Sequence, residues 1–194
     1  IPLLIFIKNE RISSYEKNLR WEVIRYGFFH LFPVVVAAVA MIMDIRAAKV
    51  DNGWILFSLI LGLTGCIWRK GIAGISYFAV GSIMPLFLIV LFIFGMMGAG
   101  DIKLFCALGG VMGLGAIWKC ILFSFLAGAC IAVVLLIFNH NFCERILYFI
   151  KYAENTVSTG KITPYRSKDI SAPENFHFTI PVFVSVLLYA GGIY

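Results

Sequence analysis

Two aspartates in this 194-residue chain stand at the ends of apolar runs. Asp44 closes the apolar stretch 26–43, and Asp101 follows three glycines crowded into positions 95–100. Placing a carboxylate at the edge of hydrocarbon costs roughly a few kcal/mol unless it is paired, hydrated or neutralised. Both acids are therefore candidates for a functional site. A solvated acid in a helix-breaking loop is the alternative that spacing alone leaves open for Asp101.

Two carboxylates brought close together are the parts of an aspartic hydrolase. They cannot both ionise at short range, so one keeps a proton while the other takes a proton from the water that attacks a carbonyl. Transporters and channels also use buried acids, so the residue types leave both an enzyme and a small proton-coupled transporter open. The remaining candidate acids lie in polar connections, where a solvated charge is the ordinary case: Asp51, Glu144, Glu154, Asp169 and Glu174.

The composition indicates a membrane protein. Hydrophobic residues make up 61% of the chain, charged residues 13%, and the mean hydropathy is +0.95. The five cysteines form no CxxC pair, so a zinc site or a disulfide framework is not expected. The sequence implies no other metal and no organic cofactor. The net charge of +6 is modest, and basic residues beside membrane spans usually contact anionic lipid. Membrane lipid is therefore an expected partner and nucleic acid is not, while the oligomeric state stays open.

The apolar runs predict an all-α, polytopic integral membrane protein with about six transmembrane helices. Residues 1–25 mix both charges with interfacial aromatic residues and are expected to form an N-terminal interfacial segment, followed by a transmembrane domain over 26–194. Within that domain the polar loop 139–175 has the spacing of an amphipathic helix lying on the bilayer. The expected spans are 26–43, 54–68, 72–94, two short helices within 104–138 that turn near Trp118 and Lys119, and 176–194.

The number of spans predicts where the two acids lie. Two crossings separate Asp44 from Asp101, and an even number of crossings returns the chain to the face it left. Both carboxylates are therefore expected on one side of the membrane, together with segment 139–175. The 16 lysines and arginines divide evenly between the two faces, so the positive-inside rule gives no orientation.

Four further residues are candidates for the site. Gly98 and Gly100 are expected to shape the active-site loop that carries Asp101, because glycine adopts conformations closed to other residues and allows close approach. Asn52 and Lys103 are candidates for substrate contact. For Lys103 a lysine that extends its ammonium to the lipid headgroups is the alternative.

Several of these motifs resemble those of a known family. Gly98-Ala-Gly-Asp101, continued as Ile-Lys-Leu-Phe and Ala107-Leu-Gly-Gly110, resembles the GxGD signature of the prepilin peptidases, the type IV leader peptidases of bacteria and archaea. Asp44-Ile-Arg, followed by Asn52 and an apolar helix, is similar to the first aspartate motif of that family. The likeness covers roughly residues 30–135. A weaker likeness to a proline-containing helix of the family lies at Thr179-Ile-Pro181-Val-Phe183.

The chain departs from the family pattern in two places. Val50-Asp-Asn52 stands where members often have Ile-Pro-Asn, and the cysteine-bearing insertion of larger, methylating members has no counterpart here. The resemblance therefore implies a short, peptidase-only form with Asp44 and Asp101 as catalytic residues. It further implies a multi-pass protein of the cytoplasmic (inner) membrane that removes the leader peptide from type IV prepilin-like precursors at the cytoplasmic face.

Overall fold

The computed structural model describes residues 27, 29–138 and 177–194, and every regular element in these ranges is a helix. The expected all-α fold is confirmed for this part of the chain. The expected interfacial segment 1–25 and the amphipathic helix within 139–175 lie outside the described residues. In chain order the helices are a first helix Phe29–Ala47, then α2 (Asn52–Lys70), α3 (Ala73–Ile83), the 3-10 helix η1 (Met84–Leu88), α4 (Ile89–Ile93), α5 (Ala99–Met112), α6 (Leu114–Phe138) and α8 (Thr179–Ala190).

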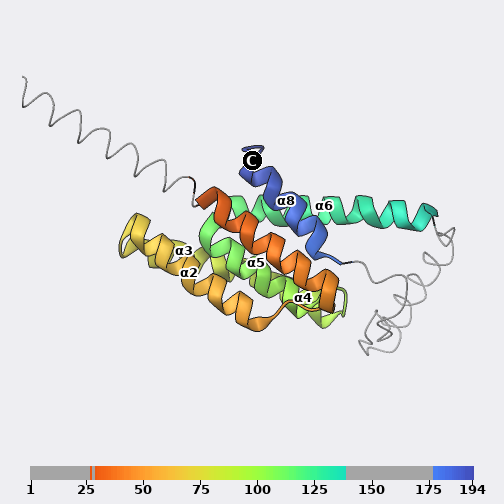
Figure 1. The fold of residues 1–194 in the computed structure, drawn as a ribbon, viewed down its shortest axis with the longest axis horizontal. Coiled ribbons are helices and arrows are strands. Elements are labelled where there is room, and N and C mark those ends of the chain that lie inside the picture. The colour runs from red at the N-terminus through yellow and green to blue at the C-terminus, as the bar shows by residue number, and fades with distance from the viewer. Residues whose placement is uncertain (1–26, 28, 139–176) are drawn as a thin grey trace, which may run out of the picture.

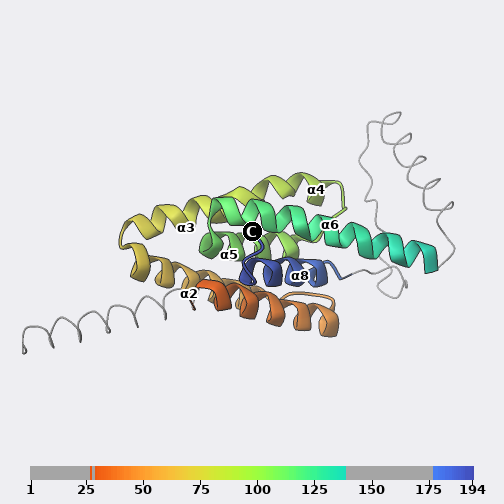
Figure 2. The same ribbon diagram turned by 90° about the horizontal axis from the view of Figure 1, so that it is seen from above.

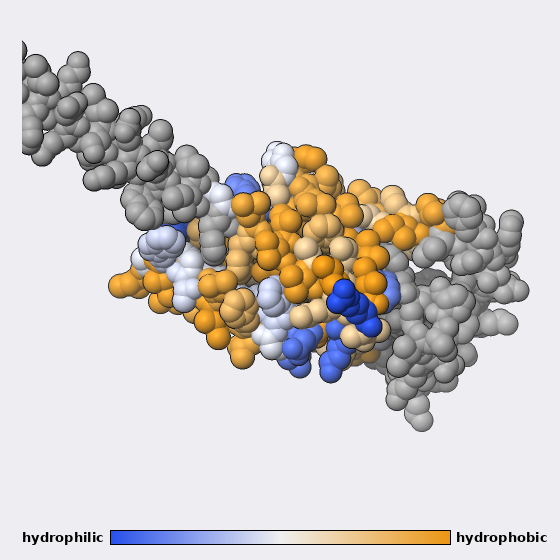
Figure 3. Space-filling view, viewed as in Figure 1, coloured by the Kyte–Doolittle hydropathy of each residue, from blue (hydrophilic) through white to orange (hydrophobic). Residues whose placement is uncertain are grey.

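Three helical stretches of the described chain are long and apolar enough to cross a membrane: Phe29–Ala47, Ala73–Ile93 and Leu114–Val134. Large apolar side chains are exposed along these stretches, among them Leu31, Val90 and Leu126. Figure 3 shows hydrophobic residues covering much of the visible face. Exposed apolar surface of this extent is what lipid-facing helices present. These three candidate spans indicate a multi-pass membrane protein, and six spans stay a prediction.

The helices form an elongated bundle whose members run roughly along its long axis (Figures 1 and 2). The first helix ends, and α2, α5 and α8 begin, toward one end of the bundle, where α4 also lies. The turn that joins α2 to α3 lies at the other end. Residues that close the first helix, open α5 and open α8 are thus brought to the same end.

Helix α5 is the centre of the bundle. From Ile102 to Met112 nearly every residue is buried, because α2, α3 and α6 all pack against this helix. An α-helix that is apolar on all sides belongs in the interior. Its first turn carries Asp101, so the acid is attached to the most enclosed element of the described fold.

Helices α3 and α5 cross at two glycines. A Cβ atom on Gly81 would overlap the carbonyl oxygen of Gly109, and a Cβ atom on Gly109 would overlap the carbonyl oxygen of Gly81. Small residues at a crossing let two backbones approach closely, which favours helix association in lipid. This crossing therefore requires glycine on both helices.

The prediction of a turn near Trp118 and Lys119 was wrong. Helix α5 ends at Gly113, whose φ is +82°, and Trp118 and Lys119 lie inside α6. The Gly113 N–H donates to the Gly109 carbonyl at 2.8 Å, and a Cβ atom on Gly113 would overlap the Tyr77 hydroxyl. A left-handed residue with no room for a side chain has to be glycine, and this requirement, not the charge of a lysine, ends the helix.

Helix α8 packs along α6. Val182 and Val186 of α8 are fully buried, and the Ser185 hydroxyl donates to the Cys120 carbonyl of α6 at 2.9 Å. These contacts fix the position of α8 relative to the bundle. The beginning of α8 is thereby held at the end of the molecule where the two acids lie.

Candidate active site

A cavity of about 260 Å³ lies where the first helix ends and α5 and α8 begin. Its volume exceeds the roughly 30 Å³ that one water molecule occupies in the liquid, so it has room for water and for part of a peptide. Segments far apart in the sequence contribute to its wall. Both candidate acids line it, together with residues from the connection before α2, from α6 and from the start of α8: Asp44, Lys49, Asp101, Phe125, His177 and Phe178.

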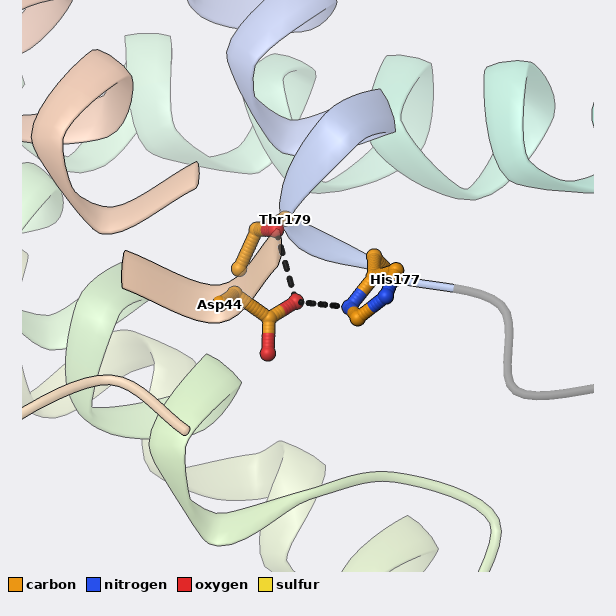
Figure 4. A network of polar contacts seen from close by, with 3 residues as sticks. All are labelled: Asp44, His177 and Thr179. Atoms are coloured by element: carbon orange, nitrogen blue, oxygen red, sulfur yellow. Dashed lines mark hydrogen bonds and ion pairs between the residues drawn. The ribbon is translucent and has the colours of Figure 1, made fainter. Parts of the chain in front are cut away.

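Asp44 lies in the last turn of the first helix, and its side chain is 16% exposed. The Thr179 hydroxyl donates to Oδ2 of Asp44 at 2.8 Å, and Nδ1 of His177 lies 3.1 Å from the same oxygen (Figure 4). A carboxylate taken out of water is costly unless polar groups contact it. The beginning of α8 supplies those groups.

Asp101 is in the first turn of α5, which begins after the extended residue Gly98 (φ −77°, ψ 144°). The Asp101 N–H donates to the Gly98 carbonyl at 3.2 Å. Unpaired N–H groups give the first turn of a helix a partial positive charge, which stabilises a carboxylate there. The local sequence thus places this acid where the backbone itself favours negative charge.

The two glycines before Asp101 do not have the conformation that was expected of them. Neither Gly98 nor Gly100 has a positive φ, and the left-handed residue of this stretch is Gly95, with φ +68°. What Gly98 provides is space, because a Cβ atom there would lie 3.2 Å from Oδ2 of Asp101. A Cβ atom on Gly100 would lie 3.9 Å from Cβ of Val50, an ordinary contact. Both glycines line the cavity, and their part in catalysis stays a prediction.

Asn52 and Lys103 contact each other. Nζ of Lys103 donates to Oδ1 of Asn52 at 2.9 Å, which links α5 to the first turn of α2. Asp51, the preceding residue, accepts the Gly53 N–H at 3.2 Å and caps α2. Among the described residues that line the cavity, neither Asn52 nor Lys103 occurs. The structure therefore gives this pair a role in holding α2 against α5, and substrate contact stays a prediction.

Two residues of the site were not found from the sequence, His177 and Thr179. A signal was present, because both open the last apolar run, on the face to which the span count had assigned the two acids. Thr179 is fully buried, and a buried hydroxyl group needs a hydrogen-bond partner. A polar residue at the start of a span, on the same side as two unexplained acids, was the pattern to examine.

The described residues contain no group of three or more His, Cys, Asp or Glu side chains arranged to hold a metal ion. The described site offers two carboxylates in the wall of one cavity that has room for water. One acid can accept a proton from water and the other can donate one to a leaving group.

Comparison with known proteins adds one match. The model of the type IV leader peptidase family matches residues 31–137, which include the first helix from its third residue, α2 to α5, and α6 up to its penultimate residue. No curated protein and no solved structure matches the chain.

Proposed function

Since the chain belongs to the type IV leader peptidase family and is thereby an aspartic prepilin peptidase, we propose that Asp44 and Asp101 are its catalytic pair. The observation that carries the proposal is the single cavity that both side chains line. These residues stand 57 positions apart (101 − 44 = 57), and two long helical segments separate them. Two acids that line one cavity with room for water and part of a peptide are what aspartic hydrolysis needs.

In the proposed reaction one carboxylate removes a proton from a water molecule as its oxygen attacks the scissile carbonyl carbon. The protonated partner donates a hydrogen bond to the carbonyl oxygen and then gives its proton to the leaving amine as the C–N bond breaks. The pair ends with one proton, as it began, so no other reactant is needed besides water. The scheme needs one ionised and one protonated carboxyl group at the same time, and an asparagine in place of either aspartate supplies neither.

The proposed substrate is a type IV prepilin-like precursor, cut between its leader and its apolar helix. The apolar helix of the precursor would lie in lipid against the exposed apolar faces of the enzyme, while the extended scissile segment enters the cavity at the end of the bundle. We place this end at the cytoplasmic face of the inner membrane, because a basic leader stays in the cytoplasm.

The proposed membrane topology has α2 as an additional span and keeps six helices in the bilayer. Helix α2 has 19 residues, or about 28 Å at 1.5 Å per residue, against a hydrocarbon thickness of about 30 Å. Helices α5 and α8 have 14 and 12 residues. Both are shorter than a full span. Other helices of the bundle pack around them and can separate their ends from lipid.

Co-expression with a candidate prepilin tests the activity. The expected result is a faster-migrating product whose N-terminal sequence begins at the first residue after the leader. A precursor that stays intact when both proteins are inserted in the membrane would contradict a peptidase acting on that class of substrate. It would return the transporter alternative to consideration.

A further inference from the structure

We propose that His177 and Thr179 are positioning residues for Asp44, and that they hold its carboxylate by Oδ2 so that Oδ1 is the oxygen offered to water and substrate. The inference rests on the proposed catalytic role of Asp44. It assigns a part in the reaction to the start of α8, which lies outside the 31–137 region matched by the family model.

Both contacts converge on one atom. The Thr179 hydroxyl donates to Oδ2 at 2.8 Å and His177 Nδ1 lies 3.1 Å from it, whereas Oδ1 takes part in neither contact (Figure 4). A carboxylate oxygen only accepts, so the favourable arrangement has a proton on Nδ1 of His177. Two donors on a single oxygen suit an ionised carboxylate, which is the form that a general base requires. These contacts fit Asp44 as the member of the pair that accepts the proton of water.

The two donors are held in place by the residue between them. The ring of Phe178 lies 5.2 Å from the ring of Phe125 on α6 and 6.3 Å from the ring of Phe105 on α5, measured between centroids. Aromatic rings at these separations pack favourably, and Phe105 is fully buried. With Phe178 fixed between α5 and α6, the backbone on either side of it has little freedom. The same packing therefore relates Asp44 to the helix that carries Asp101.

The two donors also differ in their surroundings. Thr179 is fully buried, whereas the side chain of His177 is 30% exposed and lines the cavity. His177 can thus be changed with little effect on packing, and Thr179 can be changed to residues of the same shape. Each donor provides a matched pair of substitutions.

The test measures kcat and KM for prepilin cleavage by four purified variants. Thr179→Val keeps the shape and removes the hydroxyl, and Thr179→Ser keeps the hydroxyl. His177→Ala removes the donor, and His177→Asn keeps an N–H group near the position of Nδ1. A catalytic group displaced by up to about 1 Å loses up to about 100-fold in rate, so kcat is expected to fall about 10- to 100-fold in Thr179→Val and His177→Ala. KM is expected to stay within about twofold, and the Ser and Asn variants should recover most of kcat.

Three results would overturn the inference. The first is wild-type kcat in both Thr179→Val and His177→Ala. The second is a loss carried by KM instead of kcat, and the third is equal impairment of the disruptive and the conservative variants. If Thr179→Val does not fold, the partly exposed His177 pair decides alone. Asp44→Asn and Asp101→Asn are measured in the same assay. Activity in either aspartate variant would refute the proposed function. If both aspartate variants are inactive while the His177 and Thr179 variants are fully active, only this inference is refuted.

Discussion

Replacing Gly109 by alanine should separate α5 from α3 and lower the stability of the bundle. The added methyl group would overlap the carbonyl oxygen of Gly81, which is backbone and cannot turn aside as a side chain can. Overpacking of a close-packed interior typically costs about 1–3 kcal/mol, and a backbone clash belongs at the upper end. Alanine in a helix gains up to about 1 kcal/mol over glycine, so we expect a net loss of about 2 kcal/mol.

Gly115→Ala is the matched control. Gly115 is also helical, in the first turn of α6, and a Cβ atom there would meet nothing within 4 Å. The same chemical change without the clash should leave stability unchanged or slightly raised. Gly81→Ala should behave like Gly109→Ala, because it meets the same crossing from the other helix.

Thermal unfolding in detergent can be followed with a thiol-reactive fluorogenic dye. Cys66 and Cys120 are buried and become reactive on unfolding, so Cys106, Cys130 and Cys143 are first replaced by alanine. A loss of 1 kcal/mol lowers Tm by about 2–4 °C in a domain of this size, so Gly109→Ala should unfold about 4–8 °C below the background protein. A Tm equal to that of Gly115→Ala would show that the two helices do not approach as closely as this crossing requires.

Two further predictions concern the site. Gly98→Ala should lower kcat about tenfold, because its Cβ atom would lie 3.2 Å from Oδ2 of Asp101 and displace that carboxylate. Gly100→Ala should keep its activity, because its Cβ atom would lie 3.9 Å from Cβ of Val50, an ordinary contact. Equal kcat values for the two variants would argue against this prediction. In a background without native cysteines, Lys49→Cys at the cavity should resist an impermeant thiol reagent in spheroplasts and react after lysis, whereas Ile72→Cys, 87% exposed at the other end, should react from outside. The reverse labelling pattern would place the acids on the outer face and exclude a cytoplasmic leader as substrate.

The sequence predicted that Asp44 and Asp101 lie at the same end of the bundle, because this depends on the parity of the spans, whereas their meeting in one cavity depends on packing. Two apolar segments between the acids return the chain to the same end of the bundle, and this holds whether or not α2 spans the full bilayer. Apolar length and composition also sufficed for the all-α fold and for the expected spans 26–43 and 72–94, which contain or overlap observed membrane-length helices.

The contacts that depend on shape could not be predicted in this way. The turn after α5 is set by Gly113, where Tyr77 leaves no room for a side chain, and an apolar run gives no sign of that neighbour. Hydropathy predicts that Lys119 interrupts the apolar run 104–138, yet the helix continues through this residue because its side chain is exposed. His177 and Thr179 reach Asp44 across 133 and 135 positions, a pairing that only the packing of α8 on α6 creates.

The most direct test of the catalytic pair is the cleavage rate of purified Asp44→Asn and Asp101→Asn, with Asp51→Asn as the control. Asp51 is also an acid of the described region, but it caps α2, and asparagine caps a helix about as well. Asn keeps the size of Asp and cannot exchange the proton that general acid–base catalysis needs. We expect both site variants to be folded and to cleave at least about 100-fold more slowly than the wild type, with Asp51→Asn close to wild type. Cleavage at the wild-type rate by either Asp44→Asn or Asp101→Asn would contradict the catalytic pair.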